Sequence, residues 1–344
     1  MNGSLENLML SEESEGECIP FTKKDPISKA IKVACYTVLM LLSLLGNGAV
    51  VAIVAKKRYM RTTTNILIAN MAWSDLLLSS IAVPREITEI LIGYRRWLVN
   101  GLPGEVLCKV AYFIQDISTA VSIQSVVVIT LDRYTGVVCP FRRPTITPKR
   151  RKFVIALIWL ISMALHVIYF YTVHHEQVKG VSFCFFDNPR VVKINFIVIS
   201  VILIVIPLII ITVLYSLIFR ALKRHKPFWK GFASSFTKRR RKENTKIIWK
   251  ILAIIVLFVI CILPLDIIGF LFFFAWHKKI PCGMDHLSFA AKFIFYSNAS
   301  LNPYVYFLLN ERYRRSLRNI LKGKEYFPRE EALKDIEMNI LKRL

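Results

Sequence analysis

Acidic residues are scarce in this chain of 344 residues, which has 23 Asp and Glu against 47 Lys and Arg. A formal net charge of +24 is typical of nucleic-acid-binding proteins when the basic residues gather on one domain. Here they alternate with long apolar segments, so we expect no nucleic-acid partner. Charge is nearly missing from seven stretches, each long enough to cross about 30 Å of hydrocarbon as a helix of roughly 20 residues. These predicted spans are 33–55, 66–84, 110–131, 153–173, 194–219, 251–276 and 287–309.

The spans also lack the features of two other classes of membrane protein. A transporter is expected to have inverted repeats or unwound half-helices, and neither is evident. An intramembrane protease needs a Ser/His or paired-Asp arrangement within the spans, whereas His166 stands alone and the three Asp residues lie in no proteolytic motif. The loops are too short to hold a catalytic domain. We therefore predict no enzyme, and a transporter stays only as the alternative from another class.

The order of charges along the chain predicts its orientation. Basic residues crowd the segments after spans one, three, five and seven, the alternate loops are mixed, and the first residues are acidic. By the positive-inside rule, the N-terminus is extracellular and the C-terminus cytoplasmic. No cleavable signal peptide is expected, and Asn2 begins a glycosylation sequon on the outer side. The predicted segments are an extracellular tail (1–29), a transmembrane bundle (30–309), an amphipathic helix on the inner leaflet (310–322) and a cytoplasmic tail (323–344).

The seven cysteines fall into three groups by their predicted position: within spans, on the cytoplasmic side and on the outer side. Two of the seven, Cys35 and Cys261, lie within spans, and Cys139 lies on the predicted cytoplasmic side, where thiols stay reduced. Four cysteines on the outer side permit three disulfide connectivities, and sequence alone does not choose between them. These four are Cys18, Cys108, Cys184 and Cys282.

Ionisable side chains inside a span are costly, so each is a functional candidate. Asp75 lies midway along the second span, and amides and hydroxyls occupy comparable depths in other spans. Their oxygens could hold a small cation such as sodium, or they could form a hydrogen-bond network without an ion. The candidate sodium residues are Asn47, Asp75, Ser122, Asn298 and Asn302.

A second polar layer is predicted nearer the outer face. Glu86 follows Asp75 by eleven residues, which is three helical turns on the same face. An outward-opening cavity and a Glu86–Lys292 ion pair that only braces the helices both remain open as interpretations. The candidate ligand-binding residues are Glu86, Gln115, Asp116, Asp266, Lys292 and Tyr296.

Several spans contain proline, which breaks the helical hydrogen-bond ladder and favours bends about which helices can pivot. Together with these prolines, an ordered set of marks, at least one in each span, resembles the rhodopsin-like (class A) family of G protein-coupled receptors over residues from about 30 to 322. The marks are Gly46-Asn47, Asn70, Asp75, Cys108, Asp132-Arg133-Tyr134, Trp159, Pro207, Tyr215, Phe258, Cys261, Pro264, Asn302-Pro303 and Tyr306. The implied fold is an all-α seven-transmembrane helix bundle with a short amphipathic eighth helix.

The resemblance also implies roles for individual residues. It implies a Cys108–Cys184 disulfide, leaving Cys18 and Cys282 for a second bridge. It implies that Asp132 pairs with Arg133 at rest, and that outward movement of helix six frees Arg133 to bind a heterotrimeric G protein. The other residues implied in coupling and switching are Tyr134, Phe141, Tyr215, Tyr306, Ile123, Pro207, Phe258, Pro264, Asn302 and Pro303.

Two residues depart from the family pattern. Ile262 stands where the family usually has Trp, so the usual aromatic switch beneath the ligand is missing. The acid nearest to the position that locks against the arginine in many relatives is Glu243, which makes an inter-helix lock doubtful.

Two positions argue against two classes of receptor within the family, the monoamine receptors and the light receptors. Gln115 stands where monoamine receptors have Asp, and Tyr296 where light receptors have Lys. The stretch RTTTNILIANMAWSDLL resembles neuropeptide receptors of the RFamide, neuropeptide Y and galanin-like group. This implies a plasma-membrane receptor for a basic, C-terminally amidated peptide, with arrestin, receptor kinases and membrane lipid as further partners. A chemokine-like protein or a small organic molecule is the alternative ligand.

Overall fold

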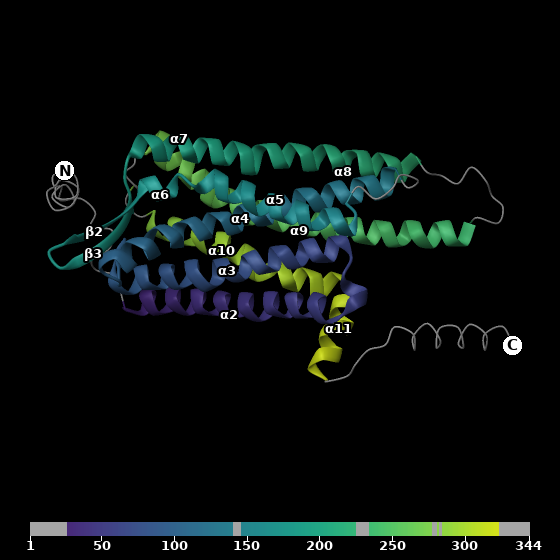
Figure 1. Ribbon diagram of the computed structural model, residues 1–344, viewed down its shortest axis with the longest axis horizontal. Coiled ribbons are helices and arrows are strands. Elements are labelled where there is room, and N and C mark those ends of the chain that lie inside the picture. The colour runs from purple at the N-terminus through teal and green to yellow at the C-terminus, as the bar shows by residue number, and fades with distance from the viewer. Residues whose placement is uncertain (1–25, 140–145, 225–233, 277–280, 282–283, 323–344) are drawn as a thin grey trace.

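The computed structural model describes residues 26–139, 146–224, 234–276, 281 and 284–322. Long helices lie side by side along the longest axis, with a small sheet at one end of the bundle and α11 near the other (Figure 1). We call these the hairpin end and the α11 end. The helices are α2 (Pro26–Lys56), α3 (Thr63–Ile92), α4 (Gly101–Val138), α5 (Pro148–His166), α6 (Tyr169–Thr172), α7 (Pro189–Ser200), α8 (Ile206–Arg224), α9 (Ser234–Phe270), α10 (Asp285–Leu309) and α11 (Glu311–Leu321).

Six helical stretches in the described part of the chain are long and apolar enough to cross a membrane. The seventh predicted span, α10, is more polar because it carries Lys292, Asn298 and Asn302, and it packs against α9, α2 and α3 within the bundle. The six stretches are Pro26–Lys56, Thr63–Ile92, Gly101–Val138, Pro148–Thr172, Pro189–Ala221 and Ile251–Ala275.

The burial pattern is that of a bundle surrounded by lipid. Large apolar side chains point outward, among them Leu45, Phe153 and Leu308, whose exposed fractions are 71%, 70% and 72%. Many polar side chains point inward, including Asn47 and Asp75 at 1% and 2%. A soluble protein rarely exposes this much contiguous apolar surface, whereas in a bilayer the costly groups are the polar ones. The predicted all-α membrane bundle is therefore confirmed.

Three spans depart from the regular helices predicted from the sequence. The predicted fourth span, 153–173, is not one helix: α5 ends at His166, α6 is a separate turn, and Val173 begins strand β2. The fifth and sixth spans each contain a π-helical turn, η2 (Val201–Val205) and η3 (Leu271–Ala275). Such turns are found mostly at functional positions in helices.

The hairpin end is covered by a three-stranded antiparallel sheet that the sequence analysis did not predict. Strands β2 (Val173–Val178) and β3 (Val181–Phe186) form a hairpin, and β1 (Arg96–Trp97) pairs with β3. The two-residue loop needs left-handed backbone, with φ of 51° at Lys179 and 82° at Gly180.

The predicted Cys108–Cys184 disulfide is confirmed and ties β3 to α4. The predicted glycosylation site at Asn2, the Cys18–Cys282 bridge and the coupling residue Phe141 lie outside the described residues.

Close packing at the α11 end joins α2, α10 and α11. A Cβ on Gly46 would lie 2.5 Å from Pro303 Cγ, so only glycine permits this approach of α2 to α10. Asn310 caps α11 by accepting a hydrogen bond from Arg312 N at 3.1 Å. Buried Tyr313 anchors α11 to the bundle, while its four arginines are exposed. This amphipathic helix covers residues 311–321 of the predicted 310–322 segment.

Candidate functional site

A cavity of about 290 Å³ lies toward the hairpin end among α4, α6, α7 and α9. Three of the six residues predicted to bind ligand line it: Gln115, Asp116 and Asp266. Its walls combine these polar groups with aromatic rings such as those of Phe273 and Phe295. Concave sites with a few convergent polar groups on apolar walls are typical of ligand pockets.

The cavity holds two carboxylates and, among its described lining residues, no Lys or Arg. Asp266 accepts a hydrogen bond from Ser200 Oγ at 2.8 Å. Asp116 accepts hydrogen bonds from Tyr169 Oη and, at 3.2 Å, from Gln115 Nε2. Both carboxylates are thus held by neutral donors, which leaves their negative charge available to a cationic group.

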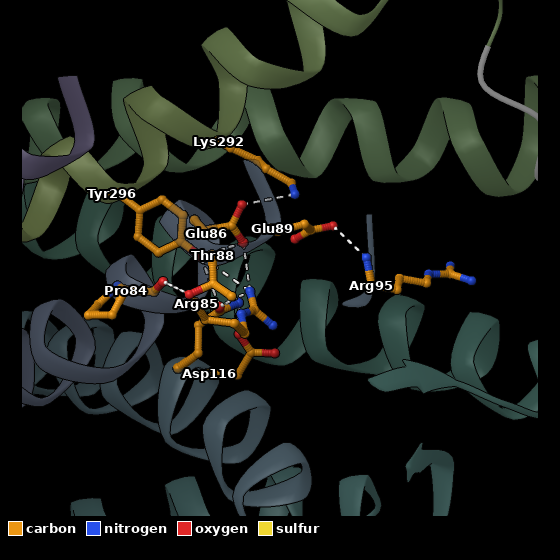
Figure 2. A network of polar contacts seen from close by, with 10 residues as sticks. Pro84, Arg85, Glu86, Thr88, Glu89, Arg95, Asp116, Lys292 and Tyr296 are labelled. Atoms are coloured by element: carbon orange, nitrogen blue, oxygen red, sulfur yellow. Dashed lines mark hydrogen bonds and ion pairs between the residues drawn. The ribbon is translucent and has the colours of Figure 1, made fainter. Parts of the chain in front are cut away.

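The other three predicted ligand residues, Glu86, Lys292 and Tyr296, lie together with Arg85 (Figure 2). With Gln115, which bonds to Arg85 and Tyr296, they form what we call the Glu86 cluster. One Glu86 oxygen accepts from Lys292 Nζ at 3.1 Å, and the other from Arg85 Nη2 at 2.7 Å and Tyr296 Oη at 3.2 Å. The bracing ion pair considered from the sequence is therefore present, with a second cation on the same carboxylate.

Arg85 is the residue of this cluster that the sequence analysis missed. Its side chain is 10% exposed, and its guanidinium lies 4.0 Å from the centre of the Tyr112 ring. It also donates to Gln115 Oε1 at 2.8 Å, so it links α3 to α4. Its Nε and Nη1 atoms find no hydrogen-bond partner among the described residues. The predicted span ended at Pro84, whereas α3 continues to Ile92 and carries Arg85 into the bundle.

Gln115 joins the cluster to the cavity. Its oxygen accepts from Arg85 and, at 2.9 Å, from Tyr296 Oη, and its nitrogen donates to Asp116. A continuous polar chain therefore runs from Lys292 on α10 through α3 and α4 to Asp116. Hydrogen bonds in such chains polarise one another, so a group that binds Asp116 also acts on the Glu86 cluster.

Deeper in the bundle, Asp75 is 2% exposed and connects α3, α4 and α10. It accepts from Ser122 Oγ at 3.2 Å and from Asn302 Nδ2 at 3.0 Å. Asn47 does not contact it directly but donates to the Ala299 carbonyl at 2.9 Å. The amide oxygens of Asn47, Asn298 and Asn302 are buried and find no donor among the described residues. Carboxylate and amide oxygens are the kinds of ligand that suit a hard cation.

Between the cavity and the α11 end, three of the predicted switch residues meet. Ile123 of α4, Pro207 of α8 and Phe258 of α9 all line one small apolar pocket. Pro264 lies further along the same helix, α9. The structure therefore brings the predicted packed trio together from three different helices.

At the α11 end, Arg133 donates to Asp132, as the resemblance implied. Asp132 is 9% exposed and also accepts from Thr64 Oγ1 at 3.3 Å. Arg133 Nε is buried and finds no partner among the described residues. The arginine is thus held by its neighbouring acid while part of its hydrogen-bonding capacity stays unused.

The tyrosines predicted to take part in switching pack in the same core. Tyr215 and Tyr306 are each 5% exposed, and the Tyr215 hydroxyl has no partner among the described residues. Tyr306 stacks on Tyr313 with ring centres 5.9 Å apart, and Tyr134 packs against the same buried core. The side chain of Glu243 lies outside the described set.

Comparison with known proteins agrees with this arrangement. The chain is 27% identical over 312 residues to a QRFP-like peptide receptor of Branchiostoma floridae, covering 86% of this chain and 79% of that protein. It is 28% identical over 319 residues to neuropeptide Y receptor type 1 of Xenopus laevis, covering 89% and 84%. It is 28% identical over 312 residues to neuropeptide FF receptor 2 of Mus musculus, covering 86% and 73%. The family described as 7 transmembrane receptor (rhodopsin family) matches residues 46–306, and the chain therefore belongs to that family.

Proposed function

We propose that this protein is a peptide-activated G protein-coupled receptor of the plasma membrane whose ligand places a cationic group between Asp116 and Asp266. The observation that carries the proposal is the cavity itself, which has two carboxylates and no described Lys or Arg in its lining. Inside a membrane, an unpaired carboxylate is costly, and a charge-assisted hydrogen bond from an Arg or Lys side chain offsets that cost. The similar proteins from three animals are receptors for neuropeptides by name.

The structure changes the role we give to Glu86. Its carboxylate already has two cations and a hydroxyl, so a ligand cation would have to displace one of them. We assign Glu86, Lys292 and Tyr296 to bracing the pocket wall, and Asp116 and Asp266 to the ligand cation. Gln115 lies in both groups and is expected to sense the ligand at Asp116.

The orientation and the output follow from charge and from the α11 end. Basic segments predict that the α11 end faces the cytoplasm and the hairpin end faces outside. Agonist binding would favour a packing in which α9 moves outward and Arg133 leaves Asp132 for a heterotrimeric G protein. Both partners must bind that packing better than the resting one, so each strengthens the binding of the other. Receptor kinases and arrestin would follow at the same face, and the arginines of α11 would contact anionic lipid. As a signalling receptor, the chain would carry no catalytic residues.

The Asp75 centre would hold a sodium ion in the resting packing. The supporting observations are the 2% exposed carboxylate and the unpaired amide oxygens of Asn47, Asn298 and Asn302. Ser122 and Asn302, which now donate to Asp75, would turn their oxygens toward the ion.

The direct test is a screen of amidated peptides with and without Arg or Lys, reading G protein dissociation in cells that express the full chain. Basic peptides are expected to activate. For any active peptide, Asp266→Asn and Asp116→Asn should each lower potency by roughly tenfold or more, because charge-assisted hydrogen bonds contribute about 1.5–3 kcal/mol. Glu105→Gln is the matched control, since Glu105 is an exposed acid paired with Lys109 on the same helix.

Cell-surface expression must be measured for each variant so that misfolding is not taken for lost binding. Potency that is unchanged in both Asp variants at normal expression would contradict the proposed contact. Silence toward every peptide, with a response to a chemokine-like protein or a small organic molecule, would support the alternative ligand class.

A further inference from the structure

A second, smaller cavity lies directly below the ligand cavity, and we call it the apolar chamber. Its volume is about 40 Å³, and all twelve side chains that line it are apolar. Ile123 comes from α4, Leu203 from the π-turn η2, Pro207 from α8, and Phe258 and Ile262 from α9. The chamber therefore lies where three helices meet and includes the predicted switch trio.

The chemistry of the chamber defines what it can hold. Its volume is room for roughly three water-sized spheres, but a water needs two to four polar partners, and no side chain of the lining offers one. An apolar cavity of this kind stays dry and accepts small apolar molecules. Its lining atoms lack neighbours on one side, so an apolar group that enters gains dispersion contacts without losing hydrogen bonds.

The chamber adjoins the ligand cavity. Four residues line both: Ile123, Leu203, Ile204 and Ile262. On α9, Ile262 lies four residues before Asp266, which is one helical turn away on the same face. A ligand whose cation contacts Asp266 therefore has an apolar recess within one turn beneath it. Isoleucine fills less of this boundary than tryptophan would.

We propose that the apolar chamber receives a small aliphatic group of the activating ligand. This inference rests on the proposed function, and it names the group that binds below the ligand cation. The occupant touches Pro207, Phe258 and Ile123 directly, so ligand binding acts on the α4–α8–α9 packing without an aromatic side chain at position 262. One methyl branch of an aliphatic side chain can enter a space of about 40 Å³, whereas a rigid phenyl ring cannot enter in part, which makes the preference aliphatic.

Xenon tests the chamber itself in the purified full-length protein in lipid nanodiscs. With the δ1 methyl groups of isoleucine labelled for NMR, xenon pressure should shift Ile123 and Ile262 in a saturable way. Ile209 and Ile260 are 58% and 59% exposed on the lipid-facing surface and report xenon dissolved in the bilayer, which should change linearly. A linear response at all four methyl groups would overturn the proposal.

Ile262→Trp should abolish the saturable shift at Ile123 because the indole fills the space. Ile260→Trp is the matched control, as it adds the same indole to the outer face of the same helix. If Ile262→Trp does not fold, Ile262→Phe serves the same purpose. If the Ile123 methyl signal still shifts in a saturable way in a folded Ile262→Trp or Ile262→Phe variant, xenon binds outside the apolar chamber and the proposed location is wrong.

The ligand is tested with two sets of amidated peptides that end in Arg-Leu or Arg-Phe and are otherwise identical. The Leu set should be more potent by about tenfold, and Ile262→Trp should remove this preference while Ile260→Trp keeps it. Greater potency of the Phe set, or a preference that Ile262→Trp leaves unchanged, would overturn the assignment of the aliphatic group. Silence of both sets would count against the proposed function, while the xenon titration still decides whether the chamber binds.

Discussion

The buried carboxylates of this receptor differ in their hydrogen-bond partners. That difference distinguishes the carboxylate that braces the helices from the two that we propose to bind the ligand. Glu86 has two cationic partners, and Lys292 keeps 38% of its side chain exposed. Among the described residues, the hydrogen-bond donors to Asp116 and Asp266 are neutral. Removing one member of a buried ion pair leaves the other charge uncompensated, which commonly costs more than the pair contributes. Replacing the acid by its amide should therefore lower the stability of the protein at Glu86, and weaken ligand binding at Asp116 or Asp266.

Glu86→Gln is expected to lower the free energy of unfolding by about 3–5 kcal/mol, because buried Arg85 loses its only described carboxylate partner. Arg85→Gln should lower it less, since Glu86 keeps Lys292. Thermal unfolding of the purified protein in nanodiscs measures both. Glu105→Gln, at an exposed pair, is the control and should leave the melting temperature unchanged. A larger loss for Arg85→Gln than for Glu86→Gln would contradict this description of the cluster.

Sodium should stabilise the resting protein through Asp75. In a titration of sodium chloride against choline chloride at constant ionic strength, sodium at ten times its Kd adds about 1.4 kcal/mol. The variant Asp75→Asn should lose this difference because the amide no longer attracts the cation. Asp75→Asn that retains the sodium effect, or wild-type protein that responds equally to both salts, would speak against a sodium site.

At this scale the sequence predicted much of the site, and the misses have physical reasons. Asp75, Gln115 and Asp266 stood out because ionisable and amide groups are rare in apolar spans. Arg85 was missed because the apolar run, and with it the predicted span, ends at Pro84. A proline inside a membrane helix costs one hydrogen bond and a bend, and neighbouring helices can satisfy the freed carbonyl, so the helix can continue.

Among the elements, the β2–β3 hairpin is the one whose position depends on a covalent link. The Cys108–Cys184 disulfide closes a sequence separation of 76 residues and holds the hairpin against α4. Phe186 of β3 lines the ligand cavity and packs on Tyr112 and Tyr169 with ring centres 4.8 Å and 5.4 Å apart. The disulfide therefore fixes one wall of the pocket.

Replacing both cysteines (Cys108→Ala with Cys184→Ala) should destabilise the protein by about 4 kcal/mol, from the loop closure that the bridge provides. Peptide potency should fall as well, because Phe186 is no longer held. Thermal unfolding and the G protein assay measure the two effects. Cys139→Ala is the matched control, since Cys139 is a free thiol at the other end of α4. Normal potency in the double variant would contradict the role of the hairpin.

The long helices could be predicted from the sequence, whereas the hairpin and the π-turns could not. The apolar runs predicted the long helices because a bilayer allows few other structures for such segments. The hairpin was not recognised, since 173–186 adjoins a span and only the turn at Lys179-Gly180 signals it. The π-turns η2 and η3 leave no pattern in uniformly apolar sequence. Yet η2 contributes Leu203 to both cavities, so a local irregularity that sequence could not predict helps to shape the site.

The signalling that we propose for the whole molecule depends on two packings of one helix bundle. We expect the resting packing to be stabilised by the ion pair of Arg133 with Asp132 and by the hydrogen bonds of Asp75. A ligand that fills the cavity and the chamber acts on the contacts of α9 with α4 and α8. Because packed helices rearrange between discrete states, a small change at one end can move the other.

The most direct measurement is the distance between spin labels at Lys149→Cys and Trp249→Cys, exposed positions at the α11 ends of α5 and α9, in a Cys139→Ser background. With an activating basic peptide and a G protein, we predict a new population at longer distance as α9 moves outward. The added Arg133→Gln substitution should weaken the effect of the G protein. A distance distribution that stays the same whatever is bound would contradict the account.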